Sequence, residues 1–354
     1  MVRLALLFLV FGSTVWAQRL DFKRWRERES DTPIRGAALF APSQLFLWGD
    51  SLATVRLPRL RSGQTSTSGR FGAGGCLIDV NQDGIPDPVL YQLPERAGQL
   101  GTMVWLASPD YEANVIDTDA EFSDCLATTL FGEPGVLLLH RHAQVRFYKV
   151  PAAEPGKRWP YRELYSIYTA SAQGGLLRAD VDNDGREDIL AGNYWLRSPA
   201  DAEDSWRLFP INNWWNGPQT AMLRLGWAKP MALAAERQGD PARVSWFLPS
   251  KDAAAFWTEA PLEAVPPIRK PEALIVADLN RDGRKEVVIG ENAGPGSRLL
   301  IYWALEDGRY QGSEIDKTEG LVSLFATDVN RDDNVDLVGV GPRSVIVWRS
   351  QRRK

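Results

Sequence analysis

The sequence predicts a seven-bladed β-propeller whose four-stranded blades are each about 50 residues long. Three observations predict this all-β fold. An acidic nine-residue segment occurs four times, the copies follow a regular spacing, and short apolar runs flank each copy. Because the unit nearest the N-terminus is weakly marked, six and eight blades remain alternatives.

The acidic segments set the period of the repeat. They span residues 79–87, 180–188, 278–286 and 328–336, and their starts are separated by 101, 98 and 50 residues. A period near 50 residues leaves room for two units without the acidic residues, and apolar runs at 125–128 and 232–235 mark them. A further unit is predicted upstream, where residues 36–41 and 45–48 flank a Pro-Ser turn.

The apolar runs on either side of an acidic segment predict the two strands of a β-hairpin. Runs such as 274–277 and 287–290 are short, rich in β-branched residues and bounded by turn residues. A unit of this size cannot bury its faces alone, whereas radial stacking buries them between neighbouring units. We therefore expect a single propeller domain over residues 18–354.

The first 17 residues predict a secretory signal peptide. Arg3 provides the positive region, residues 4–10 the apolar core, and Ala17 ends a small-residue cleavage context. This predicts an extracytoplasmic protein, periplasmic or secreted, with a retained membrane anchor as the alternative. No later segment is long and apolar enough to span a membrane.

The two cysteines, Cys76 and Cys125, occupy equivalent positions in adjacent units. An oxidising compartment would permit a disulfide between them, but the distance between the two Cα atoms does not follow from the sequence. Their equivalent apolar positions favour two buried free thiols, and the disulfide remains the alternative.

The acidic segments predict about four calcium sites. Positions 1, 3, 5 and 9 carry side-chain oxygens and position 7 would offer its backbone carbonyl, a ligand set that suits Ca²⁺. An EF-hand is excluded because position 12 carries no side-chain oxygen and a strand follows the segment. The expected ligands are Asp79, Asn81, Asp83, Ile85, Asp87, Asp180, Asp182, Asp184, Arg186, Asp188, Asp278, Asn280, Asp282, Arg284, Glu286, Asp328, Asn330, Asp332, Asn334 and Asp336.

Position 6 of the segment requires a sharp backbone turn. Gly84, Gly185 and Gly283 supply it in three copies, and Asp333 replaces the glycine in the fourth. Aspartate tolerates the left-handed conformation better than most residues, so we expect the fourth site to survive in weakened form.

With these loops and their apolar flanks, as in residues 176–180 and 189–192, the chain resembles the FG-GAP/VCBS repeat family, integrin-α-type propellers of exported bacterial proteins. The resemblance covers residues 36–350. It implies a calcium ion in each intact loop between the first two strands of a blade, with ligand recognition more often on the opposite face. From the affinities typical of extracellular modules, we expect the role of calcium to be structural. Three of the seven units depart from the pattern, and the F-G and G-A-P consensus motifs of the family are largely missing. The resemblance therefore does not identify a ligand.

An aromatic and amide-rich stretch is the candidate ligand-binding region. Tyr194, Trp195, Trp214 and Trp215 lie in it, and such side chains stack on sugar rings. Packing between blades is the alternative use of the same residues.

No catalytic residue can be nominated, and we interpret the two histidines, His140 and His142, as surface or blade-edge residues.

Charge and motifs narrow the function to three classes. A net charge of -4 with nearly balanced acids and bases gives no field that attracts nucleic acid. In order of preference, we expect a binding module for carbohydrate or a cell-surface polymer, a scaffold for protein partners, or a calcium-dependent polysaccharide-active enzyme of lyase type. The enzyme has only fold analogy in its favour. The oligomeric state does not follow from the sequence.

Overall fold

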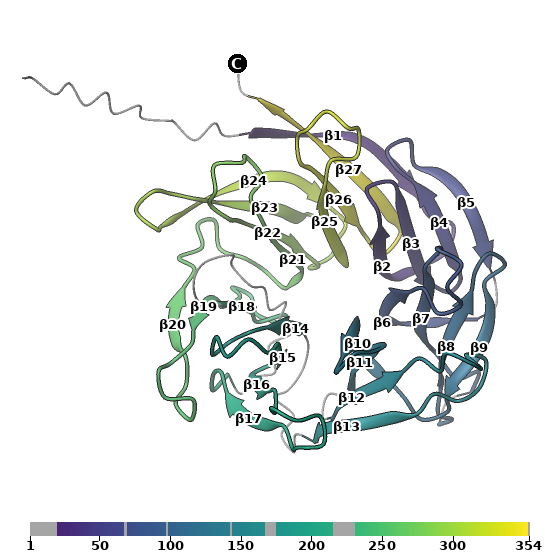
Figure 1. The fold of residues 1–354 in the computed structure, drawn as a ribbon. Coiled ribbons are helices and arrows are strands. Elements are labelled where there is room, and N and C mark those ends of the chain that lie inside the picture. Colours follow the sequence, from purple (N-terminus) through teal and green to yellow (C-terminus); the bar gives the residue numbers. More distant parts are fainter. Residues whose placement is uncertain are drawn as a thin grey trace, which may run out of the picture.

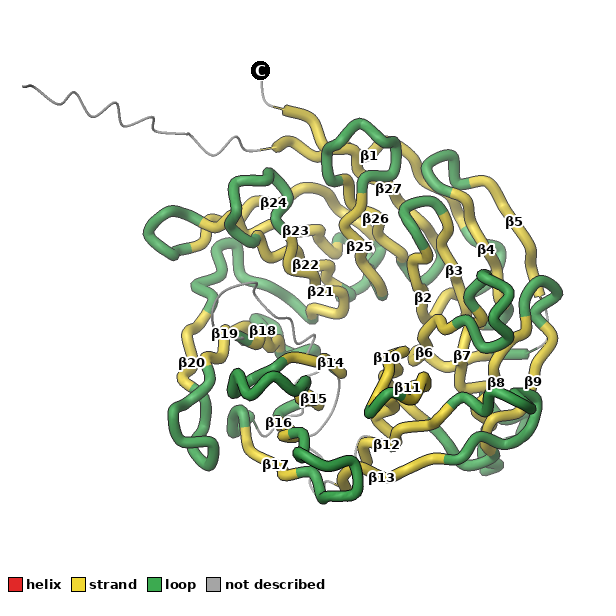
Figure 2. Tube along the Cα trace, viewed as in Figure 1, coloured by secondary structure: helices red, strands yellow, loops and turns green. Residues whose placement is uncertain are grey.

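The protein is a seven-bladed β-propeller, as the sequence predicts. The computed structural model describes residues 20–66, 69–96, 98–141, 144–166, 175–214 and 231–352. Within these ranges the regular elements are 27 β-strands, which form seven antiparallel sheets placed around a ring (Figure 1). Figure 2 shows the same view with the strands and the loops that join them distinguished. This part of the chain contains no helix with the length and apolarity that crossing a membrane requires.

We number the blades along the chain. Blade 1 contains β2 (Ile34–Phe40), β3 (Gln44–Gly49), β4 (Leu52–Arg56) and β5 (Arg61–Ser66). Blade 2 contains β6 (Phe71–Ile78), β7 (Asp87–Gln92), β8 (Thr102–Ala107) and β9 (Glu112–Asp117). Blade 3 contains β10 (Phe122–Leu130), β11 (Glu133–His140), β12 (Gln144–Lys149) and β13 (Tyr161–Ser166). Blade 4 contains β14 (Leu176–Ala179), β15 (Asp188–Ala191), β16 (Tyr194–Arg197) and β17 (Arg207–Pro210).

The remaining blades complete the ring. Blade 5 contains β18 (Ala232–Ala235), β19 (Val244–Leu248) and β20 (Thr258–Pro261). Blade 6 contains β21 (Pro271–Ala277), β22 (Glu286–Glu291), β23 (Ser297–Ala304) and β24 (Tyr310–Thr318). Blade 7 contains β25 (Ser323–Thr327), β26 (Asp336–Val340), β27 (Ser344–Arg352) and, from the other end of the chain, β1 (Leu20–Glu29).

Two blades differ from the sequence-based expectation. Blade 5 has three strands in the described residues, because Pro266 and Pro267 lie where a fourth strand would form and proline cannot donate to a sheet. In blade 7 the outermost strand is β1, which pairs with β27 from Leu20↔Arg352 to Glu29↔Ser344 (Figure 1). The ring is therefore closed by the two ends of the described chain.

The apolar core lies between the blades rather than at the centre of the ring. Among the described residues the buried side chains form seven clusters, each made by two neighbouring blades. Second strands such as β22 are buried along their whole length, because both of their faces pack against a neighbouring blade. The blades thus stabilise one another, and the loops between strands are left at the rims of the ring.

A disulfide joins Cys76 to Cys125 with their Cα atoms 5.3 Å apart. Our preference for two free thiols is therefore wrong. The equivalent positions do lie in the core, in β6 and β10, but the first strands of blades 2 and 3 approach closely enough for a covalent link.

Candidate metal-binding loops

The four acidic segments form the loops between the first and second strands of blades 2, 4, 6 and 7. In each blade the first strand ends immediately before position 1 and the second strand begins at position 9. The two apolar strands fix the ends of the loop, since the second strand is buried between blades and the first is at least partly buried there. A run of polar residues is thereby held in a closed turn of constant length.

The four loops share one backbone path. Position 4 is left-handed in every copy, with φ between 58° and 62° at Gln82, Asn183, Arg281 and Arg331. Position 6 is left-handed as well, with φ between 82° and 86° at the three glycines and 65° at Asp333. The expectation that Asp333 adopts the glycine conformation is confirmed.

Replacing Asp333 by glycine is expected to stabilise the protein by about 1 kcal/mol, since a non-glycine residue is strained in the left-handed region. The reverse change, Gly283→Asp in blade 6, is the matched control and should destabilise by a similar amount. A Cβ at Gly283 would meet open space, so only backbone conformation is altered. Urea unfolding in calcium measures both; if Gly283→Asp destabilises while Asp333→Gly does not stabilise, the Asp333 carboxylate itself contributes.

The carboxylate at position 1 organises each loop. One of its oxygens accepts the backbone N–H of position 5 at 3.1 to 3.2 Å, and the other accepts the N–H of position 6 at 2.8 to 3.0 Å. The carboxylate at position 5 accepts the N–H of position 7 at 2.7 to 3.0 Å. These bonds turn the side-chain oxygens of positions 1 and 5 towards the inside of the loop.

The carboxylate at position 9 is fully buried in all four loops. In blades 2, 4 and 7 it accepts the backbone N–H of a serine at the end of the third strand, at 2.7 to 2.9 Å from Ser108, Ser198 and Ser350. In blades 2, 4 and 6 it also accepts the N–H of position 2. Position 9 therefore ties the loop to its blade as well as facing its interior.

Burial changes the acidity of these groups. Loss of hydration raises the pKa of Asp188 to about 6 and that of Glu286 to about 7, and it raises the pKa of Asp87 and Asp336 in the same direction. A buried carboxylate of this kind gains from a nearby positive charge that restores its ionised form.

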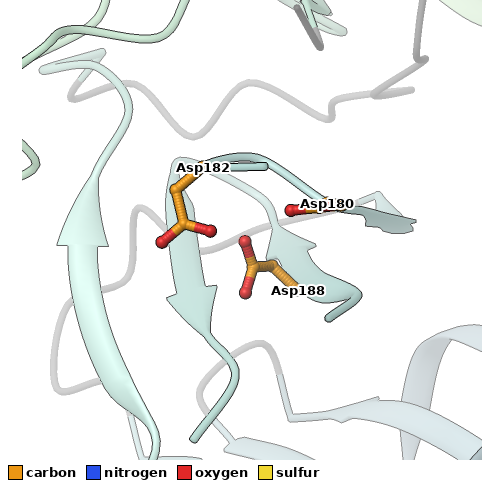
Figure 3. A group of neighbouring side chains, drawn as sticks. All are labelled: Asp180, Asp182 and Asp188. Carbon is orange, nitrogen blue, oxygen red and sulfur yellow. The ribbon is translucent and has the colours of Figure 1, made fainter. Parts of the chain in front are cut away.

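The loop of blade 4 brings three carboxylates together (Figure 3). Asp180, Asp182 and Asp188 each offer an oxygen, and these oxygens lie within 4.8 Å of one another. The three side chains come from the start, the middle and the end of the loop, and they converge on its inside (Figure 3). The arrangement could hold a metal ion. In the other three loops an asparagine replaces the aspartate of position 3.

Some carboxylate oxygens of the loops are buried without a hydrogen-bond partner among the described residues. They are Asp182 Oδ1 in blade 4, Glu286 Oε1 in blade 6 and Asp336 Oδ2 in blade 7. Leaving such an atom unpaired costs free energy, and a cation inside the loop would satisfy it. Oxygen is also the ligand atom that Ca²⁺ prefers, so the residues fit this ion.

Arginine side chains lie against the position 5 aspartate in three of the loops. Arg284 Nη2 is 2.8 Å from Asp282 Oδ2, and Arg349 Nη2 is 2.7 Å from Asp332 Oδ2. In blade 4 both Arg186 and Arg197 contact the same oxygen of the position 5 aspartate. Burial opposes ionisation of Asp332, but Arg349 and two asparagines outweigh it and lower the pKa of Asp332 to about 2.

Arg197, Arg349 and the serines of the third strands were missed by sequence reasoning, whereas Arg186 and Arg284 were named only for their backbone carbonyls. Arg197 and Arg349 each precede one of the serines that bind position 9, so both come from the end of a third strand. The Arg-Ser pair recurs in blades 4 and 7, but it lies at different distances from the acidic segment and becomes recognisable only when the strands are aligned.

The described tryptophans of the aromatic candidate region, Trp195 and Trp214, lie in the core between blades rather than on a binding face. Trp195 and Trp214 are 4% and 3% exposed and belong to the cluster between blades 4 and 5, so assigning them to ligand binding is wrong. Trp195 packs on Trp257 with ring centroids 6.4 Å apart, and Trp214 packs on Phe247 at 5.3 Å. Large aromatic side chains fill the wedge between blades here. Tyr194 is half-buried, and Trp215 lies outside the described residues.

His140 is also an interior residue. It ends β11, is 3% exposed, and its Nδ1 lies 3.0 Å from Oε1 of Gln144. Burial and nearby arginines lower the pKa of His140, so the ring is held neutral. We interpreted His140 as a surface or blade-edge residue; a surface position is wrong, because the side chain is buried at the end of the apolar strand β11. His142 lies outside the described residues.

No protein-family model matches the chain, and no curated protein matches it either.

Proposed function

We propose that this chain is an exported, calcium-stabilised β-propeller of the FG-GAP/VCBS type that works as an interaction module. The observation that supports the proposal is that the four loops share one residue pattern, one backbone path and the same hydrogen bonds. All four copies are left-handed at a non-glycine residue in position 4, which costs free energy, and calcium held by the inward-facing oxygens would offset that cost.

Calcium is favoured over other ions by the chemistry of the loops. Carboxylate, amide and backbone oxygens are hard ligands, and the loops contain no thiolate or imidazole that would attract zinc or copper. Magnesium keeps most of its water and demands an octahedron, whereas calcium accepts flexible cages made wholly of protein oxygens. When bound, the ion would supply positive charge to the buried position 9 carboxylates and hold together the first two strands of blades 2, 4, 6 and 7.

Export is supported by the signal-like N-terminal sequence and by the disulfide. Cys76 and Cys125 are linked, and such bonds persist in oxidising compartments. An interaction role is supported by the architecture, because the seven packed blades form a ring with loops at its rims (Figure 2). The loops can vary in sequence without disturbing the clusters between blades.

Calorimetric titration of the metal-free protein with calcium tests the proposal, and about four bound ions are expected. Asp180→Ala should reduce the stoichiometry by one, since it removes position 1 of the blade 4 loop. Asp182→Asn is the matched control and should leave the stoichiometry unchanged, because asparagine occupies this position in the other three loops. Absence of binding heat, or an unchanged stoichiometry in a folded Asp180→Ala variant, would contradict the assignment.

A further inference from the structure

A pocket of about 560 Å³ lies in blade 4 beside the metal-binding loop. It is formed by the end of β16, the turn that follows, the start of β17, and one arginine of the loop itself. Its polar groups belong to Arg186, Arg197, Arg207, Ser198, Asp204 and Ser205. The volume is that of a site for a small ligand rather than for a single ion.

Three arginines are concentrated in this pocket. Arg186 and Arg197 both contact Oδ2 of Asp184, so their guanidinium groups lie close together. Arg197 and Arg207 are directly opposite each other on β16 and β17. Like charges in opposite positions of two strands destabilise a sheet, and among the described residues no carboxylate lies within ion-pair distance of Arg207. A bound anion would remove this repulsion.

Calcium in the adjacent loop would make the pocket more attractive to anions. Without an ion, the four aspartates of the loop outnumber the two arginines that lie on them, and the local charge is negative. Arg197 Nε is then engaged by Asp182 Oδ2 at 2.6 Å. A divalent cation cancels the excess negative charge and competes for the same carboxylates, which leaves the guanidinium groups available to another anion.

We propose that this pocket binds an acidic sugar unit through its carboxylate, and that calcium in the blade 4 loop is required for tight binding. The inference rests on the proposed function, since it takes calcium as the ion of that loop. Arginine forks match the planar carboxylate and bind it with two parallel hydrogen bonds.

A sugar fits the remaining pocket groups better than an acidic peptide does. Asp204 is exposed and offers acceptors only, while Ser198 and Ser205 can donate or accept. A uronic acid carries hydroxyl groups that donate to Asp204 and bond to the serines, in addition to the carboxylate that meets the arginines. A glutamate or aspartate side chain carries no hydroxyl group, so in a peptide only the backbone N–H groups could donate to Asp204.

The experiment is a calorimetric titration of the full chain with trigalacturonate at fixed free calcium, with the neutral trisaccharide maltotriose and a hexaglutamate peptide as comparison ligands. Arg207→Gln should weaken trigalacturonate binding about tenfold, the factor that corresponds to losing one charge-assisted hydrogen bond. Arg309→Gln, at an exposed arginine of blade 6, is the matched control and should bind as the wild type does.

The calcium requirement is tested blade by blade. Asp180→Ala removes the position 1 ligand in blade 4 and should weaken trigalacturonate binding at least about tenfold, because the arginines stay engaged by the remaining aspartates. Asp278→Ala makes the same change in blade 6 and should leave saccharide affinity unchanged. Comparison at one free calcium concentration cancels the affinity of trigalacturonate itself for the ion.

Each possible result of these titrations tests a different part of the proposal. Wild-type affinity in Arg207→Gln, or equal binding of maltotriose, would overturn the carboxylate pocket, and tighter binding of hexaglutamate would overturn the sugar assignment. Equal effects of Asp180→Ala and Asp278→Ala would overturn the coupling to blade 4. Failure of the proposed function is seen separately, because the calcium titration without saccharide would then give no binding heat.

Discussion

Removal of calcium with EDTA is expected to lower the melting temperature by about 8 °C. A tenfold excess of ion over its dissociation constant stabilises the folded state by about 1.4 kcal/mol per site, so four independent sites supply about 6 kcal/mol. Unfolding entropy near 2.1 cal/mol/K per residue converts this sum to the stated shift for a domain of this length. Differential scanning calorimetry in calcium and in EDTA measures it.

The position of the loops explains why removing calcium should destabilise the whole propeller. Each loop joins the first two strands of its blade, and its buried position 9 carboxylate reaches the third strand in blades 2, 4 and 7. Losing the ion leaves these carboxylates buried without a compensating positive charge, and one oxygen of Asp336 is left unpaired. Restoring calcium should restore the melting temperature, and an equal concentration of magnesium should restore it only in part. Identical melting curves with and without calcium would contradict a stabilising role.

Loss of the disulfide is expected to cost about 4 kcal/mol, because the bond closes a loop of 49 residues in the unfolded chain. The double variant Cys76→Ala, Cys125→Ala removes it without leaving a reactive thiol. Cys76 packs in the cluster between blades 2 and 3, so alanine keeps an apolar side chain there. Urea unfolding measures the change in free energy.

Wild-type protein in dithiothreitol is the companion sample for the double variant. Its midpoint in urea should fall to nearly that of the variant, since both lack the same constraint. An unchanged midpoint on reduction would show that the packing between β6 and β10 holds blades 2 and 3 together without the bond. A variant much less stable than the reduced wild type would instead assign the loss to packing of the sulfur atoms.

The repeat could be predicted because it depends on local patterns. Apolar runs at the period of a strand and turn residues at fixed positions specify each hairpin, so all seven units were found, including the three without acids. The role of β1 could not be found in this way. Its residues 23–28 are mostly charged and exposed, and what makes them a strand is pairing with β27, far along the chain.

The ligand positions of the candidate metal-binding loops could likewise be predicted from local patterns. Positions 1, 3, 5 and 9 of the loops follow from residue type and spacing, and the left-handed turn at Asp333 follows from its alignment with three glycines. The burial of Trp195 and Trp214 did not follow, because a tryptophan in a wedge between blades and one on a rim have the same sequence context. The disulfide depended on a distance between blades, which no local pattern contains.

Pairing of β1 with β27 also determines the order in which the protein can assemble during synthesis. Leu20 and Arg352 are partners although 332 positions separate them, and closing so long a loop costs about 3 kcal/mol more than closing a ten-residue hairpin. The strand β1 is synthesised first, and its backbone groups stay unpaired until β27, the last strand, has been synthesised. Its exposed charged residues, among them Lys23, Arg24 and Arg26, discourage that edge from pairing with another nascent chain in the meantime.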